Sequence, residues 1–220
     1  MTLPTVELET AVNPQHSIIW LHGLGADGND FAPIVPDLVA SDWPALRFVF
    51  PHAPVMPVTI NNGMPMRAWY DIVGFDLQAR QDEAGVRSSM REVEALIARE
   101  HDRGVPSERI VLAGFSQGGA IALAAGLCHA QKLAGIVALS TYLPITAVVT
   151  AERHAANAAT PIFWGHGSAD PVVLMQRGVD ARDLLQSLGY TVDWHTYPMT
   201  HAVCAEEIAE LRRWLGSRLG

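Results

Sequence analysis

Short apolar runs alternate along the chain with longer segments whose apolar residues recur at helical spacing. Most of the short runs are apolar throughout, as parallel strands are when helices cover both faces of their sheet. The last run, VDWHTYP, alternates more between apolar and polar residues, which predicts a strand nearer the edge of the sheet. The runs that we predict to be strands are 17–23, 47–54, 109–116, 135–140, 161–167 and 192–198.

Helices are predicted between these strands. In the segment 76–103, apolar residues recur at steps of four, three and four, which is the spacing of one helix face; they are Val86, Met90, Val93 and Ile97. Similar spacing predicts helices within 171–188 and from residue 204 toward the C-terminal end. The segment 116–128 is small and apolar on all sides, which predicts a central, buried helix.

This alternation predicts an α/β fold in which helices cover both faces of a mostly parallel sheet. No repeat, low-complexity tract or linker interrupts the pattern, so we expect residues 1–220 to form one domain. In sheets of this kind, ligands bind beyond the carboxyl ends of the strands. The segments that follow the predicted strands are therefore the first place to look for chemistry.

The composition supports a large core and narrows the range of partners. Hydrophobic residues make up 49% of the chain and charged residues 17%, and the formal net charge is -8. Because there is no basic tract, we do not expect a nucleic-acid partner. The N-terminal residues lack a basic region followed by an apolar run, and the apolar stretch 120–128 is too short to cross a bilayer. We therefore expect a cytoplasmic protein without stable membrane insertion.

The sequence GFSQG, residues 114–118, lies between a predicted strand and the predicted buried helix. It matches the G-x-S-x-G pattern, in which a sharp turn exposes a serine and glycines two residues away avoid collisions with the neighbouring strand and helix. The hydroxyl of Ser116 would then stand at a helix N-terminus, where developing negative charge is favoured. We predict that Ser116 is a nucleophile, the alternative being a glycine-rich turn with an incidental serine.

A nucleophilic serine needs a base, and the base needs a carboxylate that orients it. In strand–turn–helix hydrolases the chain order is Ser, then Asp or Glu, then His, each after a later strand. Asp170 and His201 follow the predicted strands 161–167 and 192–198 in that order. We predict that they complete the triad, with Asp180 and Asp193 as weaker candidates for the carboxylate. His22, His52 and His166 also follow strands, so we expect them near the site.

Acyl transfer also needs hydrogen-bond donors for a tetrahedral oxygen. The backbone N–H of Gln117, directly after the nucleophile, is one predicted donor. The glycine-rich loop LHGLGADG, residues 21–28, supplies the second, and Leu24 is the predicted donor residue. Such a loop could instead bind a nucleotide phosphate, but the glycine spacing of the dinucleotide fingerprint is absent. We predict no metal and no cofactor, because no cysteine–histidine spacing indicates one.

Five motifs together resemble the small carboxylesterase and acyl-protein thioesterase family of α/β-hydrolases: HGLGADG, GFSQGGA, LSTYLP, HGSADPVV and YPMTHAV. The resemblance covers nearly the whole chain. It implies an α/β-hydrolase fold without a cap domain and the triad Ser116, Asp170 and His201. Two residues depart from the family pattern, which usually has glycine at the positions of Thr141 and Thr200. We expect Thr141 to narrow the acyl pocket and Thr200 to adopt a negative φ.

The segment 61–76 is rich in apolar residues but fits neither a helical nor a strand period. In the family this region is a loop beside the active site that contacts the acyl chain, and the alternative is an ordinary buried connection over the core. The predicted substrate-binding residues are Met64, Met66, Trp69, Phe75 and, in the LSTYLP motif, Leu143.

The sequence thus predicts a serine carboxylesterase that cleaves short- to medium-chain carboxylic esters through an acyl-enzyme intermediate. The partner would be a small-molecule acyl ester, and a homodimer is possible. The alternative is an acyl-protein thioesterase or lysophospholipase, because the same triad cleaves all these substrates and only pocket shape separates them. A non-catalytic binding protein of the same fold is disfavoured, because no member of the triad is missing.

Overall fold

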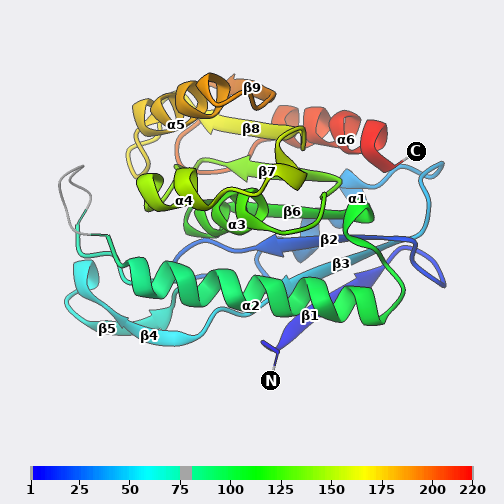
Figure 1. Ribbon diagram of the computed structural model, residues 1–220, viewed down its shortest axis with the longest axis horizontal. Helices are drawn as coiled ribbons and strands as arrows, with labels where there is room; N and C mark the ends of the chain where they lie inside the picture. The colour runs from blue at the N-terminus through cyan, green and yellow to red at the C-terminus, as the bar shows by residue number, and fades with distance from the viewer. Residues whose placement is uncertain (1, 75–80, 220) are drawn as a thin grey trace.

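A seven-stranded sheet forms the centre of the molecule, as the computed structural model shows for residues 2–74 and 81–219 (Figure 1). The strand order is β1-β3-β2-β6-β7-β8-β9. Every neighbouring pair is parallel except β1 and β3, which are antiparallel. The strands are β1 (Thr5–Glu9), β2 (His16–Leu21), β3 (Leu46–Pro51), β6 (Ile110–Phe115), β7 (Gly135–Leu139), β8 (Ile162–Gly167) and β9 (Val192–Tyr197).

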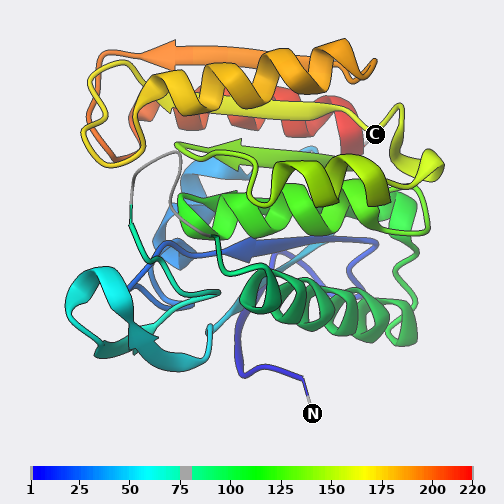
Figure 2. The ribbon, with the colours of Figure 1, turned by 60° about the vertical axis from the view of Figure 1, so that its left-hand side comes forward.

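Helices cover both faces of this sheet (Figure 2). One face is covered by α2 (Glu83–Asp102), α3 (Gln117–Cys128), α4 (Thr146–Glu152) and α5 (Met175–Ser187). The other is covered by α1 (Val35–Leu38) and α6 (Ala205–Leu219). Side chains alternate along each strand, so Ile19 and Leu21 pack in the first core while Ile18 and Trp20 pack in the second. No helix within 2–74 and 81–219 is long and apolar enough to cross a membrane.

The architecture confirms the predicted mostly parallel α/β sheet, and no separate cap domain is evident in the described ranges. All six predicted strands are present, and β9 lies at the edge, as its alternating pattern indicated. Residues 117–127 of α3 are all buried. This helix is enclosed because it packs directly on the middle of the sheet.

Several elements were not predicted. The edge strand β1 is one of them, and a separate hairpin of β4 (Val55–Val58) and β5 (Met64–Arg67) is another. Pro57 and Pro65 sit opposite each other in this hairpin, and proline is rare inside strands because it cannot donate to the ladder. The short helices α1 and α4 were also missed. The single-turn helices are η1 (Ala32–Ile34), η2 (Thr59–Asn61), η3 (Ser107–Arg109) and η4 (Ala155–Asn157).

Candidate active site

Ser116 occupies the turn between β6 and α3 with φ +54° and ψ -120°, a backbone conformation that residues with side chains rarely adopt. Three hydrogen bonds hold it there. Its N–H donates to the Leu139 carbonyl at 2.9 Å, and its carbonyl accepts from the Ala120 N–H at 3.1 Å and from the Thr141 hydroxyl at 2.6 Å. The surrounding fold therefore imposes the strained turn that presents the serine hydroxyl.

The glycines on either side of Ser116 are required by backbone atoms of neighbouring elements. A Cβ atom at Gly114 would lie 2.4 Å from the carbonyl carbon of Gly118, and one at Gly118 would lie 2.3 Å from the Leu21 carbonyl oxygen. Contacts this short are not found between real atoms, so any side chain would force the backbone apart. The predicted steric reason for G-x-S-x-G is confirmed.

The structure brings Ser116, His201 and Asp170 into one hydrogen-bonded chain. His201 Nε2 lies 2.9 Å from the Ser116 Oγ, and His201 Nδ1 lies 2.7 Å from the Asp170 Oδ2. An ionised carboxylate only accepts, so His201 Nδ1 carries the proton and Nε2 is free to accept from the serine hydroxyl. The alternative carboxylates lie elsewhere: Asp180 is exposed on α5, and Asp193 is exposed on β9 and pairs with His195.

Asp170 is oriented by the loop that follows β8. Its Oδ1 accepts hydrogen bonds from the N–H groups of Val172 and Val173 at 2.8 and 2.9 Å, which leaves Oδ2 for His201. The Asp170 side chain is fully buried, whereas that of His201 is 16% exposed. The carboxylate is thus fixed and shielded from solvent, whereas the imidazole stays partly accessible.

The two predicted oxyanion donors lie with Ser116 around one narrow cavity of about 50 Å³. Within the described part of the chain, the N–H groups of Leu24 and Gln117 have no hydrogen-bond partner. They are therefore available to a ligand oxygen. The other residues that line the cavity are Ile72, Tyr142, Val172, Val173 and Arg177.

The Gln117 side chain joins this turn to the segment 69–70. Its Oε1 accepts from the Trp69 N–H at 2.9 Å, and its Nε2 donates to the Tyr70 carbonyl at 2.7 Å. The indole N–H of Trp69 donates in turn to the His22 carbonyl at 2.9 Å. Trp69 thereby links the two segments that carry the candidate oxyanion donors.

The predicted substrate-binding residues are placed differently from one another. Trp69 is 2% exposed and packs in the core, and Met64 is 62% exposed on β5. Met66 is half-buried, and its sulfur accepts from the Asn61 amide. Leu143 is buried beside a separate hollow of about 300 Å³. Phe75 lies outside the described residues.

None of Met64, Met66, Trp69 and Leu143 lines the cavity at Ser116, so their acyl-binding role stays a prediction. Ile72, in the same apolar segment, does line it, but sequence reasoning did not single it out. Tyr142 and the pair Val172–Val173 belong to motifs that carried the family resemblance, which was the available signal. Arg177, whose guanidinium lies 3.9 Å from the Tyr142 ring centre, had no such signal.

Three histidines and two threonines complete the residues that the sequence predicted near the site. His22 and His52 both bond to the 21–28 loop, and His166 faces the Val173 carbonyl at 2.9 Å, so all three lie beside the site. Thr200 is not among the residues with positive φ, as predicted. Thr141 is buried, does not line the cavity at Ser116 and donates its hydroxyl to the Ser116 carbonyl, so its expected effect on an acyl pocket stays a prediction.

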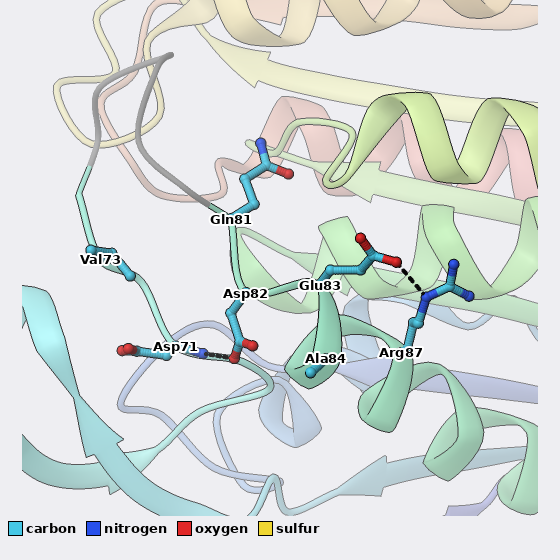
Figure 3. A pocket seen from close by; sticks show the side chains of 7 residues that line it. All are labelled: Asp71, Val73, Gln81, Asp82, Glu83, Ala84 and Arg87. Atoms are coloured by element: carbon cyan, nitrogen blue, oxygen red, sulfur yellow. Dashed lines mark hydrogen bonds and ion pairs between the residues drawn. The ribbon is translucent and has the colours of Figure 1, made fainter.

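A larger hollow of about 740 Å³ lies at the start of α2 and is lined by Asp71, Val73, Gln81, Asp82, Glu83, Ala84 and Arg87 (Figure 3). It contains no member of the hydrogen-bonded chain at Ser116. Asp82 caps α2 by accepting from the Gly85 N–H, and it also accepts from the Asp71 N–H. Arg87 bonds to Glu83. The Asp71 carboxylate accepts from the N–H and the hydroxyl of Thr59. Each of these four charged groups already has a hydrogen-bond partner, so we place the candidate chemistry at Ser116.

Comparison with known proteins gives consistent matches over nearly the whole chain. The family model described as phospholipase/carboxylesterase matches residues 4–218. Acyl-protein thioesterase 1 of Neurospora crassa is 42% identical, over 100% of this chain and 91% of its own length. A probable carboxylesterase of Oryza sativa subsp. japonica is 34% identical, over 99% of this chain and 83% of its own length.

Among solved structures, Arabidopsis thaliana SOBER1 superimposes with a TM-score of 0.88 at 34% identity, over 93% of this chain and 99% of that one. Zea mays acyl-protein thioesterase 2 superimposes with a TM-score of 0.87 at 29% identity, over 99% of both chains.

Proposed function

Since the chain belongs to the phospholipase/carboxylesterase family of α/β hydrolases, we propose that it is a serine hydrolase that cleaves acyl thioesters and, by the same steps, carboxylic esters. The sequence alone placed carboxylic esters first and thioesters second. The relatives support the reverse order, because acyl-protein thioesterases recur among the most similar ones.

The observation that carries the proposal is the continuous hydrogen-bonded chain from Ser116 through His201 to Asp170, beside two backbone N–H groups that have no partner among the described residues. In the proposed reaction, Ser116 Oγ attacks the acyl carbon while His201 Nε2 takes its proton. Asp170 holds the imidazole in the required tautomer and stabilises the imidazolium. The N–H groups of Leu24 and Gln117 would donate to the oxygen that becomes negative.

The tetrahedral intermediate then collapses, and His201 returns its proton to the leaving thiol or alcohol. A water molecule, deprotonated by His201, hydrolyses the acyl-enzyme by the same steps in reverse roles. Esters and thioesters differ in the leaving group, but the triad performs the same steps with either one. The residues that line the approach to Ser116 must therefore determine substrate choice.

The test is a set of matched thioesters and oxygen esters with acyl chains of graded length, assayed with the parent protein and Ser116→Ala. We expect hydrolysis of both classes with higher kcat/KM on thioesters, and a loss on the order of 10⁶-fold in kcat for Ser116→Ala, because triad residues act as a unit. Ser187→Ala, at an exposed position on α5, is the matched control. Activity of Ser116→Ala within tenfold of the parent would contradict the proposal.

A further inference from the structure

His22 lies between β2 and the loop that carries Leu24, and the reaction steps above do not use it. It is only 2% exposed. Its Nε2 lies 3.1 Å from the Ala53 backbone nitrogen, and its Nδ1 lies 2.7 Å from the Gly23 carbonyl oxygen. A backbone N–H can only donate, so Nε2 is the acceptor. The proton of the neutral ring is therefore on Nδ1 and is donated to Gly23.

This hydrogen bond bears on the direction of the neighbouring N–H group. The peptide bond between Gly23 and Leu24 is planar and trans, so its C=O and N–H point in opposite directions. The Gly23 carbonyl is held by His22 Nδ1 and, at 3.2 Å, by the Ala26 N–H. The Leu24 N–H must then point away from His22. It has no partner within the described residues, and Leu24 lines the cavity at Ser116.

Close packing places this peptide directly against the nucleophile. A Cβ atom at Gly23 would lie 3.6 Å from the Ser116 Cβ and 3.3 Å from the Phe115 ring. His22 itself is held by the Trp69 indole, which donates to its carbonyl and faces its ring at 5.4 Å between centres. Small rotations of the Gly23–Leu24 peptide would therefore change the direction of the Leu24 N–H bond relative to Ser116.

We propose that His22 is a positioning residue for the oxyanion hole: its neutral ring, fixed in the Nδ1–H tautomer by Ala53, orients the Gly23–Leu24 peptide so that the Leu24 N–H faces the developing oxyanion. This inference rests on the proposed function, because it concerns the same reaction. Burial lowers the pKa of His22, which favours the neutral ring that this arrangement needs. A purely structural His22 would join the loop to Ala53 and affect stability alone.

Two substitutions separate these roles. His22→Asn places an amide nitrogen where Nδ1 was, so it keeps the donor to Gly23 and loses the acceptor for Ala53. His22→Gln places its amide where Nε2 was, so it keeps the link to Ala53 and leaves Gly23 without that donor. We expect kcat of His22→Gln to fall ~10- to 100-fold with KM little changed, because an oxyanion contact is realised only in the transition state. His22→Asn should retain most of kcat even where its thermal midpoint falls.

An alkyl boronic acid supplies a second readout, because its adduct with a serine places an oxygen in the oxyanion hole. Its inhibition constant should rise for His22→Gln in parallel with the fall in kcat and stay near the parent value for His22→Asn. Equal kcat for the two folded variants, with only their midpoints changed, would overturn the inference. If the parent has no activity on the ester and thioester set, the proposed function fails instead.

A measurement on the parent protein avoids any folding defect of the variants. The ¹⁵N chemical shifts of the His22 ring at neutral pH distinguish the two tautomers. We expect the Nδ1–H form, and the Nε2–H form or a charged ring would overturn the inference.

Discussion

At the scale of single residues, the site depends on backbone groups as much as on side chains. Asp170 faces His201 with one oxygen because two N–H groups occupy the other. Ser116 is held by Leu139, Ala120 and Thr141, which belong to other parts of the chain or to the next helical turn. Asp170 and Ser116 are thus held by hydrogen bonds from groups outside the candidate triad.

The contrast between Trp69 and Ile72 gives a prediction about substrate length. Trp69→Ala should reduce kcat/KM on acetyl, butyryl and octanoyl substrates alike, because it leaves a core cavity that costs about 3–5 kcal/mol of unfolding free energy. Ile72→Ala should hurt longer chains more, by up to about 0.8 kcal/mol, or fourfold, for each methylene that loses its contact.

The measurements are kcat/KM on the three chain lengths and the thermal midpoint of each variant. A loss for Trp69→Ala that grows with chain length, at an unchanged midpoint, would instead support Trp69 as an acyl-binding residue, as the sequence predicted.

Site residues could be predicted from the sequence where their order along the chain is fixed by the fold, but not where segments far apart in the chain come into contact. Ser116, Asp170 and His201 were identified because each follows a strand in the order that the fold requires, and the structure brings them together. Arg177, in the first turn of α5, stacks on Tyr142 of the loop after β7, and no periodicity encodes a contact between segments this far apart in the chain. Trp69 looked like part of a binding loop because hydrophobic residues serve cores and pockets alike.

At the scale of elements, the close approach of α3 to the sheet explains the glycines near its start. Buried strands were predictable because the runs are continuously apolar, and α3 because it is apolar on every side. The hairpin of β4 and β5 was not, because its prolines and exposed residues resemble a loop. Edge strand β1 has only half-buried and exposed residues, so it lacked the apolar signal of the central strands.

Two glycines of α3 provide a matched test of this packing. A Cβ atom at Gly118 would meet the backbone oxygen of Leu21 at 2.3 Å, whereas one at Gly126 would meet the tip of the Ile136 side chain at 2.6 Å. Backbone in the sheet cannot yield, but a side-chain tip can rotate. Gly118→Ala should therefore cost at least the ~1–3 kcal/mol typical of overpacking.

Gly126→Ala should be close to neutral, since the gain of about 1 kcal/mol in helix propensity offsets its smaller clash. Urea denaturation of both variants checks this. Equal stability of the two would show that the start of α3 is not tightly packed.

At the scale of the whole molecule, the parallel sheet determines where the site forms. The loops after β2, β6, β8 and β9 carry Leu24, Ser116, Asp170 and His201 in turn, and parallel strands end at the same edge. Residues separated by more than half of the chain therefore meet there. The same layered arrangement buries polar groups behind the sheet, and one of them makes the stability of the molecule depend on pH.

Glu207, in the first turn of α6, is fully buried against Gly165 of β8. Burial raises its pKa from 4.5 to about 8. In the unfolded chain the carboxyl loses its proton near pH 4.5, whereas in the folded protein it keeps the proton until about pH 8. The stability that comes from keeping Glu207 protonated in the folded state is therefore fully present below pH 4.5 and is lost progressively as the pH rises to 8.

Glu207→Gln removes this titration, so its unfolding free energy relative to the parent should increase with pH across that window, by on the order of a few kcal/mol in total. Any cost of burying the amide is the same at every pH. The test is therefore the change with pH of the difference in unfolding free energy between Glu207→Gln and the parent, not the size of that difference at one pH. Urea denaturation at pH 5, 6, 7 and 8 measures it. Glu206→Gln is the control, because Glu206 is exposed and its pKa is lowered. The difference in unfolding free energy between Glu206→Gln and the parent should therefore stay constant over this pH range. A constant difference between Glu207→Gln and the parent would mean that Glu207 is already ionised in the folded protein at pH 5.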